Sequence, residues 1–427
     1  MAWKFILPVK WPPASRRYDM SFDLIYLEPL TGGYHEGHCK IFIERVPQDP
    51  RVRSLHCVVG RGFVQYAGAD PVRLSGCSGK VTFEYLSPAF LDIASSRSES
   101  PARRGIATWK EARRLVTTRP GSICFSDMFD LTIFGAVFDR TPMPGFITGI
   151  VHHPPFNLPL RENPVVELRR WGVKNGINYL ASHVAMPVVF TFDQYYLKGL
   201  PRFVSQYWHY VPDPIPLRRN VLVAAFEAPN GPRERCSRTR FFMFGSLGRR
   251  KGLVTLLEAL HRLSPLDRQR IDITLAGEIR EASPGERSEL LSFVAAAKEL
   301  RGLSFRHVDR FLSEDELVRE LRTCDVVLAP YPDHVGVSGV LLWAAAAGKP
   351  IITQKTGWIG HVVQKEQLGF VCQSCSCVEL ANTIMYASDR AIRGYFEASR
   401  LKLFSSGHSL DEFYEAIVDK LDEIAST

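Results

Sequence analysis

Long apolar runs are missing from this sequence. No stretch of about 18 consecutive apolar residues occurs, so we predict no membrane-spanning helix. The first residues, MAWKFILPVKWPPASRR, carry only a short apolar patch, which Lys10, Pro12 and Pro13 interrupt. A secretory signal has a longer apolar core and a small-residue cleavage site, and neither is found there. We therefore expect a cytoplasmic protein, with peripheral contact at the inner face of the membrane as a further option.

Cysteine is scarce, and the nine cysteines are an odd number. They are mostly scattered, which favours free thiols in a reducing compartment. Cys372, Cys375 and Cys377 lie close together, but three thiols cannot close a structural zinc site and no fourth ligand is near in sequence. We interpret them as incidental cysteines of a loop and predict no metal site.

The sequence also lacks a helix-turn-helix, a zinc finger and an RNA-binding signature, so we expect no nucleic-acid partner. The formal net charge of +8 and the isoelectric point of about 9.0 instead suit anionic ligands or an anionic lipid surface. A hydrophobic fraction of 45% is that of an ordinary globular chain, and 427 residues favour two domains over one.

What the sequence does contain is a regular alternation of strand and helix patterns. Strand patterns occur at 23–27, 53–59, 81–86, 121–126, 146–151, 188–192, 241–244, 271–276, 303–308, 325–329 and 351–353. Helix patterns occur at 39–45, 107–118, 163–180, 253–263, 313–322 and 411–424, with a further helix starting at Ser283. This alternation predicts parallel sheets wrapped by helices.

The two halves are separated by segments that cannot form regular structure. Residues 211–216 contain three prolines, and residues 227–240 are rich in proline, glycine and arginine. We predict two doubly wound, Rossmann-like domains, residues 1–230 and 231–427, facing each other across a cleft. The final helix at 411–424 is free to pack back on the first domain.

The stretch from Cys324 to Thr353 is the most informative. An apolar strand pattern ends at Pro330, and residues 335–347 carry no charge before Gly348 ends the predicted helix. A helix without a polar face is buried, and its N-terminus at the strand ends would present free N–H groups to an anion. An ordinary strand–helix–strand unit without a ligand is an equal alternative from this stretch alone.

A second loop, residues 245–252, carries three consecutive cations, Arg249, Arg250 and Lys251, at the start of a helix pattern. Helix N-termini are electropositive and prefer acidic residues, so the cations favour a bound phosphate over an idle surface turn. Lys251 is the strongest candidate, because lysine acts on phosphate as a point charge.

The first half offers weaker candidates, all at predicted strand ends. Gly32 and Gly33 follow the first strand pattern, but they do not match the dinucleotide motif G-x-G-x-x-G. His152 and His153 follow a later one, and one of the pair could contact a hydroxyl or phosphate. Asp127 and Asp130 are candidates for a base or for sugar contacts, although helix capping explains Asp130 more simply.

Taken together, these features resemble the GT-B glycosyltransferases, in particular family 4, also called glycosyl transferases group 1. The resemblance rests on Phe244-Gly245-Ser246-Leu247, Arg250-Lys251-Gly252, Leu275-Ala276-Gly277, Asp325 to Pro330, Ser338 to Ala344 and Ala347 to Pro350, with Gly32-Gly33 and His152 in the first half. It implies an acceptor-side first domain and a nucleotide-sugar-binding second domain.

The resemblance also implies roles for individual residues. It places the donor diphosphate near Lys251, Arg250 and the amides of Ser338, Gly339 and Val340. The nucleotide base would lie near Gly277, Glu278, Arg310 and Phe311, and Ser246 belongs to the same donor region. Gly32 and Gly33 would approach the donor sugar, and His152 would be catalytic. No cofactor is implied beyond the nucleoside-diphosphate sugar, which is the donor substrate.

The implied reaction transfers a sugar to an acceptor hydroxyl, with retained configuration and without a metal, as in polysaccharide or glycoconjugate biosynthesis. Three positions depart from the family pattern, which usually has arginine at the place of Ser246 and glutamates at the places of Val335 and Trp343. Two interpretations therefore stay open. One is a divergent active glycosyltransferase, and the other is a catalytically silent relative that binds nucleotide or a partner protein.

Overall fold

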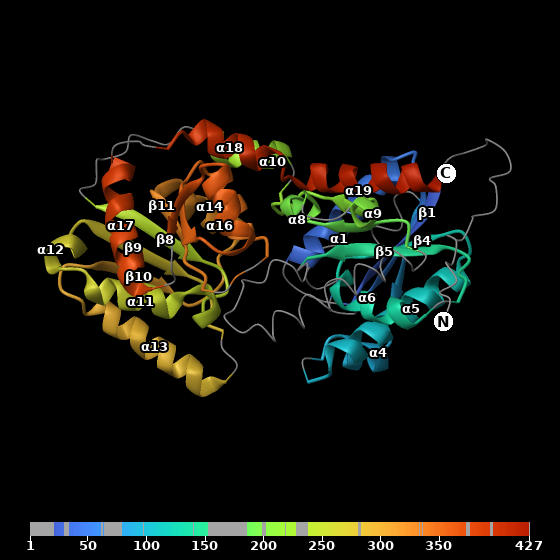
Figure 1. Ribbon diagram of the computed structural model, residues 1–427, viewed down its shortest axis with the longest axis horizontal. Coiled ribbons are helices and arrows are strands. Elements are labelled where there is room, and N and C mark those ends of the chain that lie inside the picture. Colours follow the sequence, from blue (N-terminus) through green and yellow to red (C-terminus); the bar gives the residue numbers. More distant parts are fainter. Residues whose placement is uncertain are drawn as a thin grey trace, which may run out of the picture. The chain divides into compact units, whose positions relative to one another are not determined.

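The computed structural model describes residues 21–29, 34–60, 63, 79–96, 98–139, 141–152, 186–198, 202–217, 219–227, 238–280, 283–332, 334, 336–372, 376–392 and 396–426. The chain divides into two compact units (Figure 1). The first contains residues 1–156, 160–212 and 410–427, and the second contains 157–159 and 213–409. Before the C-terminal helix, the last residue of the first unit is Pro212, whereas the sequence predicted a boundary between residues 230 and 231. The C-terminal helix α19 (Leu410–Ala425) also belongs to the first unit.

The first unit is built on a seven-stranded sheet in the order β3-β2-β1-β4-β5-β6-β7, in which every paired neighbour is parallel. Its strands are β1 (Phe22–Glu28), β2 (Val52–Val59), β3 (Val81–Tyr85), β4 (Ile123–Ser126), β5 (Phe146–Val151), β6 (Val189–Thr191) and β7 (Trp208–Tyr210). Its helices are α1 (Tyr34–Arg45), η1 (Val46–Gln48), α4 (Pro88–Ala94), α5 (Pro101–Thr118), α6 (Phe129–Phe138), α8 (Gln194–Lys198), α9 (Arg202–Ser205) and α19.

The six strand patterns of the first half are confirmed, whereas the short strand β7 was not predicted. Helix α5 begins six residues before the predicted 107–118, because Ser100 caps it through the amide of Arg103 and Pro101 follows in the first turn. Its predicted apolar face is buried on the sheet, with Trp109 2% exposed. The helix predicted at 163–180 lies outside the described residues.

The second unit holds a six-stranded parallel sheet in the order β10-β9-β8-β11-β12-β13. Its strands are β8 (Thr239–Phe244), β9 (Ile271–Ala276), β10 (Ser304–Val308), β11 (Val326–Ala329), β12 (Ile351–Gln354) and β13 (Gly369–Cys372). Its helices are α10 (Arg219–Glu227), η2 (Arg249–Lys251), α11 (Leu253–Arg262), α12 (Pro265–Arg268), α13 (Pro284–Lys298), α14 (Glu314–Thr323), α15 (Gly339–Ala346), α16 (Gly357–Lys365), α17 (Cys377–Ile392) and α18 (Ala398–Ser406).

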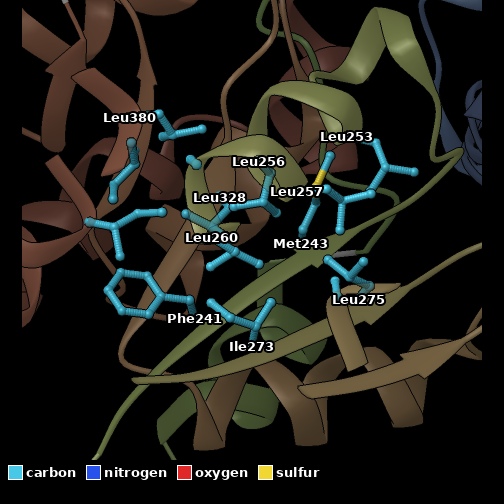
Figure 2. Packing of buried hydrophobic residues seen from close by; sticks show 14 of the residues in the cluster. Phe241, Met243, Leu253, Leu256, Leu257, Leu260, Ile273, Leu275, Leu328 and Leu380 are labelled. Carbon is cyan, nitrogen blue, oxygen red and sulfur yellow. The ribbon is translucent and has the colours of Figure 1, made fainter. Parts of the chain in front are cut away.

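One hydrophobic core of the second unit joins the sheet to helices α11, α13 and α17. Figure 2 shows leucines of α11 packed against Phe241, Met243 and Leu275 of the central strands. The amphipathic period predicted for 253–263 is confirmed, since Leu253, Leu256, Leu257 and Leu260 are all buried. This packing holds the loops at the carboxyl ends of β8 and β9 in place.

Both predicted helix starts in the second unit are confirmed as capping boxes. Ser283 with Glu286 caps α13, and Ser313 with Glu316 caps α14. Helix α15 begins at Gly339, inside the charge-free stretch 335–347, and ends at Ala346, just before Gly348. Two parallel sheets with flanking helices confirm the predicted fold class. Among the described residues, no helix is both long and apolar enough to cross a membrane.

Candidate functional site

The turn after β8 is held tightly against the loop after β11. Gly252 has a φ of 79°, and a Cβ atom at this position would lie 2.0 Å from the carbonyl oxygen of Pro330. Only glycine fits there without displacing one of the two segments. The cation-rich turn η2 is therefore next to the loop that leads into α15, because β8 and β11 are neighbouring strands.

The three cations of η2 have different surroundings. Arg249 forms an ion pair with Glu289 of α13 at 2.6 Å, and Arg250 is exposed. Lys251 turns the other way: its Nζ donates a hydrogen bond of 3.0 Å to the hydroxyl of Tyr331 and lies 4.1 Å from the centre of that ring. The lysine selected from the sequence is thus the cation directed toward the β11–α15 loop.

The N-terminus of α15 has the properties of an anion site. Ser338, at its N-cap, is 4% exposed, and its hydroxyl is buried without a hydrogen-bond partner among the described residues. Next to it, Gly339 is exposed, and no atom lies within 4 Å of where its Cβ would be. Val340 is buried and anchors the turn. An open helix start beside an unpaired donor is suited to an oxyanion.

Charge placement at the helix starts is compatible with this interpretation. Helix α14 has three acidic residues in its first turn, which satisfy its electropositive end. Helix α15 has none, and neither has α11, so their N-terminal potentials are not neutralised by a carboxylate of the first turn. Helices α4, α5, α16 and α18 also lack a first-turn carboxylate, so this charge placement leaves room for an anion at α11 and α15 but does not mark them out from other helices.

The loops after β9 and β10 carry the positions assigned to the nucleotide base. Gly277 has a φ of 149°, and its Cβ would lie 1.7 Å from the carbonyl oxygen of Gly245, so the loops after β8 and β9 touch. Ser246, in the first of these loops, is half-buried. The Arg280 guanidinium lies 4.9 Å from the centre of the half-exposed Phe311 ring. The contact joins the loop after β9 to the loop after β10 and leaves one face of the Phe311 ring accessible.

The two charged base-site candidates are engaged within the protein. Glu278 pairs with Arg280 at 2.6 Å, and Arg310 pairs with Glu316 through two contacts of 2.7 and 2.8 Å. Both pairs are largely solvent-exposed, so they cost little to open. Exposed pairs of this kind leave their side chains available to a ligand.

In the first unit, the strand ends of β4 and β5 bring together residues that the sequence could only consider separately. Asp127 is fully buried, and His38 Nδ1 of α1 lies 3.1 Å from each of its carboxylate oxygens. His152 Nε2 donates to the main-chain carbonyl of Asp127 at 2.6 Å and lies 3.7 Å from its carboxylate. Asp127 thus contacts two buried histidines.

Asp130 does not act as a helix cap, contrary to the simpler of our sequence interpretations. The N-cap of α6 is Met128, without a side-chain cap, and the Asp130 carboxylate accepts the main-chain amide of His152 at 2.9 Å. The reason is that β5 runs beside β4, so the amide at the end of β5 is within reach of the first turn of α6. Gly32, Gly33 and His153 lie outside the described residues.

The charge state of His152 follows from this arrangement. Burial disfavours the imidazolium, but the hydrogen bond and charge of Asp127, together with Asp130, outweigh burial and raise the pKa of His152 to about 9. His152 is therefore a cation at neutral pH. It suits the role of a charge or hydrogen-bond donor better than that of a general base.

Two participants were not found by sequence reasoning. His38 precedes the helix pattern predicted at 39–45 and has no local signal, because its partner Asp127 is 89 positions away. Tyr331 stands between two prolines directly after a buried strand, and an aromatic at a strand end could have been noticed. The described residues contain no group of three His, Cys, Asp or Glu side chains suited to a metal ion.

Comparison with known proteins finds a family match in the second unit. Residues 238–389 match the family described as Glycosyl transferases group 1, which confirms the resemblance of the second half. None of the curated proteins matches the chain in sequence. The fold is the GT-B fold of two Rossmann-like domains, as in the structural relatives described next.

Three solved structures share this fold over nearly the whole chain. The Burkholderia multivorans α,α-trehalose 6-phosphate synthase is 12% identical with a TM-score of 0.66, over 95% of this chain and 99% of its own. The N-terminal domain of Candida albicans trehalose-6-phosphate phosphatase is 11% identical, with a TM-score of 0.64 and coverages of 97% and 99%. Anabaena HepE in complex with UDP is 14% identical, with a TM-score of 0.60 and coverages of 94% and 100%.

Replacing Gly252 should separate the turn after β8 from the loop after β11. We expect Gly252→Ala to lower the free energy of unfolding by at least about 2 kcal/mol, since it combines a left-handed backbone with a clash against Pro330. Denaturant unfolding measures the change. Gly407→Ala is the matched control, because its Cβ would meet nothing within 4 Å. Equal stability of the two variants would contradict the tight packing.

The His152 charge can be measured directly. In an NMR titration of ring protons, we expect a midpoint near pH 9 for His152 and a lower one in Asp127→Asn, with His307 of the second unit unchanged. Because the folded pKa lies above the ordinary histidine pKa of 6.5, the stability contributed by the charged His152 should be complete below about pH 6.5 and lost as the pH rises through about 9. A midpoint below 6.5 in the native protein would contradict the assigned environment.

Proposed function

We propose that the protein is a glycosyltransferase that moves a sugar from a nucleoside-diphosphate sugar to an acceptor hydroxyl. The observation that carries this proposal is the unpaired, buried hydroxyl of Ser338 at the open start of α15, beside the loop that Lys251 contacts. The group 1 match over the second unit and the GT-B fold support it, and Anabaena HepE has been solved with UDP and with UDP-glucose.

In the proposed reaction the second unit stabilises the leaving diphosphate. Lys251 and Arg250 supply positive charge, and the amides of Ser338, Gly339 and Val340 supply donors at a helix N-terminus. Charge that develops on the phosphate oxygens is met by groups already in place, as in an oxyanion hole. Such an arrangement takes over the usual work of a divalent ion, so we propose a metal-independent reaction with retained configuration and no cofactor other than the donor.

The first unit would contact the donor sugar. We propose that His152 contacts the donor sugar or its reacting carbon as a cation or hydrogen-bond donor, held in orientation by Asp127 and Asp130. Gly32 and Gly33 would let the backbone approach the sugar after β1. On this proposal the acceptor proton leaves with the diphosphate rather than with His152, because an imidazolium cannot accept it.

A catalytically silent relative is the alternative, and one residue favours it. Trp343, which takes the place of a family glutamate, is 7% exposed and packs its ring against Phe226 of α10 at 6.4 Å between centroids. A buried indole offers no carboxylate to a ribose. Nucleotide recognition in this chain must therefore use other groups, and Glu278 and Phe311 at the strand ends are the best placed. Val335 and Asp333 lie outside the described residues.

Replacing Lys251 tests the diphosphate site. We expect Lys251→Ala to weaken binding of UDP, GDP or ADP about ten- to a hundredfold, since it removes a charge-assisted contact to phosphate, and to leave the fold intact. Isothermal titration calorimetry gives the affinity. Arg249→Ala is the control from the same turn, because Arg249 is already paired with Glu289. If both variants bind as the native protein does, the diphosphate assignment is wrong.

Donor hydrolysis distinguishes the enzyme from the silent relative. We expect slow release of free sugar from at least one member of a panel of UDP-, GDP- and ADP-sugars, with a rate that His152→Ala lowers at least tenfold while the affinity for the donor changes less. Nucleotide binding without any sugar release would favour the silent relative. An unchanged rate in His152→Ala would remove the catalytic role of this residue.

We also propose a cytoplasmic setting and, from the net charge of +8, peripheral contact with an anionic membrane surface. Synthesis of a polysaccharide or glycoconjugate is the corresponding pathway class. Binding to vesicles that contain anionic lipid, weakened by salt, is the direct measurement of such contact.

A further inference from the structure

Tyr331 is the one residue of the described chain that makes both a hydrogen bond and a ring contact with the lysine proposed to hold the diphosphate. The Lys251 ammonium lies 3.0 Å from the Tyr331 hydroxyl oxygen and 4.1 Å from the ring centre. Tyr331 itself is 1% exposed, so its position is determined by packing rather than by solvent. The contact therefore joins lysine, a flexible type of side chain, to a tyrosine that is held by packing.

The backbone leaves little freedom in this contact. Gly252, next to Lys251, abuts the carbonyl of Pro330, next to Tyr331. The Tyr331 amide also donates to Ala329 at 2.8 Å, which fixes the tight bend after β11. His334, three residues further along the loop, packs its ring edge-on against the Tyr331 ring, with 5.2 Å between the ring centres. The ring is thus held from several directions before any ligand arrives.

The geometry points to Tyr331 as a positioning residue: we propose that it holds the Lys251 ammonium in the orientation in which it meets a nucleoside diphosphate. This inference rests on the proposed function, because it assigns a task to a residue of that same site. An ammonium has three N–H donors. One is used by the Tyr331 hydroxyl, and two remain for phosphate oxygens.

The arrangement also reduces the cost of binding. A free lysine side chain loses rotamer entropy when a ligand immobilises it, and a side chain already held by Tyr331 loses less. The face of the Tyr331 ring contacts the Lys251 ammonium and replaces water on that side of the cation. Arg250 of the same turn is exposed and has no such support, so it is not expected to replace Lys251.

The contact itself is tested first, without nucleotide. Stability is measured by urea unfolding for the native protein, Tyr331→Phe, Lys251→Met and the double variant. If the two side chains interact, the effects of the single changes are not additive, and Tyr331→Phe shifts the midpoint less when Lys251 is already absent. Strict additivity overturns the proposal, because it removes the contact on which positioning depends.

The functional test repeats the cycle with UDP, GDP and ADP by calorimetry, using the nucleotide that binds most tightly. We expect Tyr331→Phe to weaken binding about three- to tenfold in the native background, as for one lost hydrogen bond, and less than about twofold in Lys251→Met. Tyr331→Leu, which also removes the ring, should weaken binding further. Tyr386→Phe is the matched control: it changes another cation-contacting tyrosine, which lies 5.0 Å from Arg390, and should leave affinity unchanged.

The outcomes separate this inference from the proposed function. If Lys251→Met weakens binding but Tyr331→Phe has the same effect in both backgrounds, the diphosphate site stands and the positioning role is overturned. Tighter binding in Tyr331→Phe also overturns it, since Tyr331 would then hold Lys251 away from the ligand. If Lys251→Met leaves the affinity unchanged, or no nucleotide binds, the proposed function fails and the inference fails with it.

Discussion

The close approach of Gly252 to the carbonyl of Pro330 is the contact on which the candidate donor site depends. It joins the turn after β8 to the loop after β11, which neighbouring parallel strands bring to the same edge of the sheet. A side chain at residue 252 would separate them. Without this contact, Lys251 would not be held against Tyr331 and would be another solvated surface cation.

The strand ends of the two units differ in charge: cations gather in the second unit, and a buried carboxylate lies at the centre of the first. In the second unit, cations and free amides gather without an acidic residue in the first turns of α11 and α15. In the first unit, the buried carboxylate of Asp127 organises two histidines, and the attraction keeps His152 protonated despite burial. A buried carboxylate is costly unless paired, so His38 and His152 also make its burial tolerable.

Helix α15 differs from the family pattern that the sequence resembles. Seven of its eight residues are buried and apolar, including the tryptophan that takes the place of a glutamate. The helix is thereby part of the core and rigid, while its first turn stays open at Gly339. Residue 343 lies one turn beyond Gly339, so the tryptophan does not close the helix start.

The sequence by itself determined the elements and their order. Apolar period, cap residues and strand-length runs are local properties, so the capping boxes at Ser283 and Ser313 and the cation-rich turn before α11 could be predicted. Short elements with weak patterns, such as β7 and β13, could not. Only the tertiary structure decided which side chains meet. Lys251 and Tyr331 are 80 positions apart, and His38 and Asp127 are 89 apart. Such pairs depend on strand order and on backbone contacts at glycine, which no local pattern records.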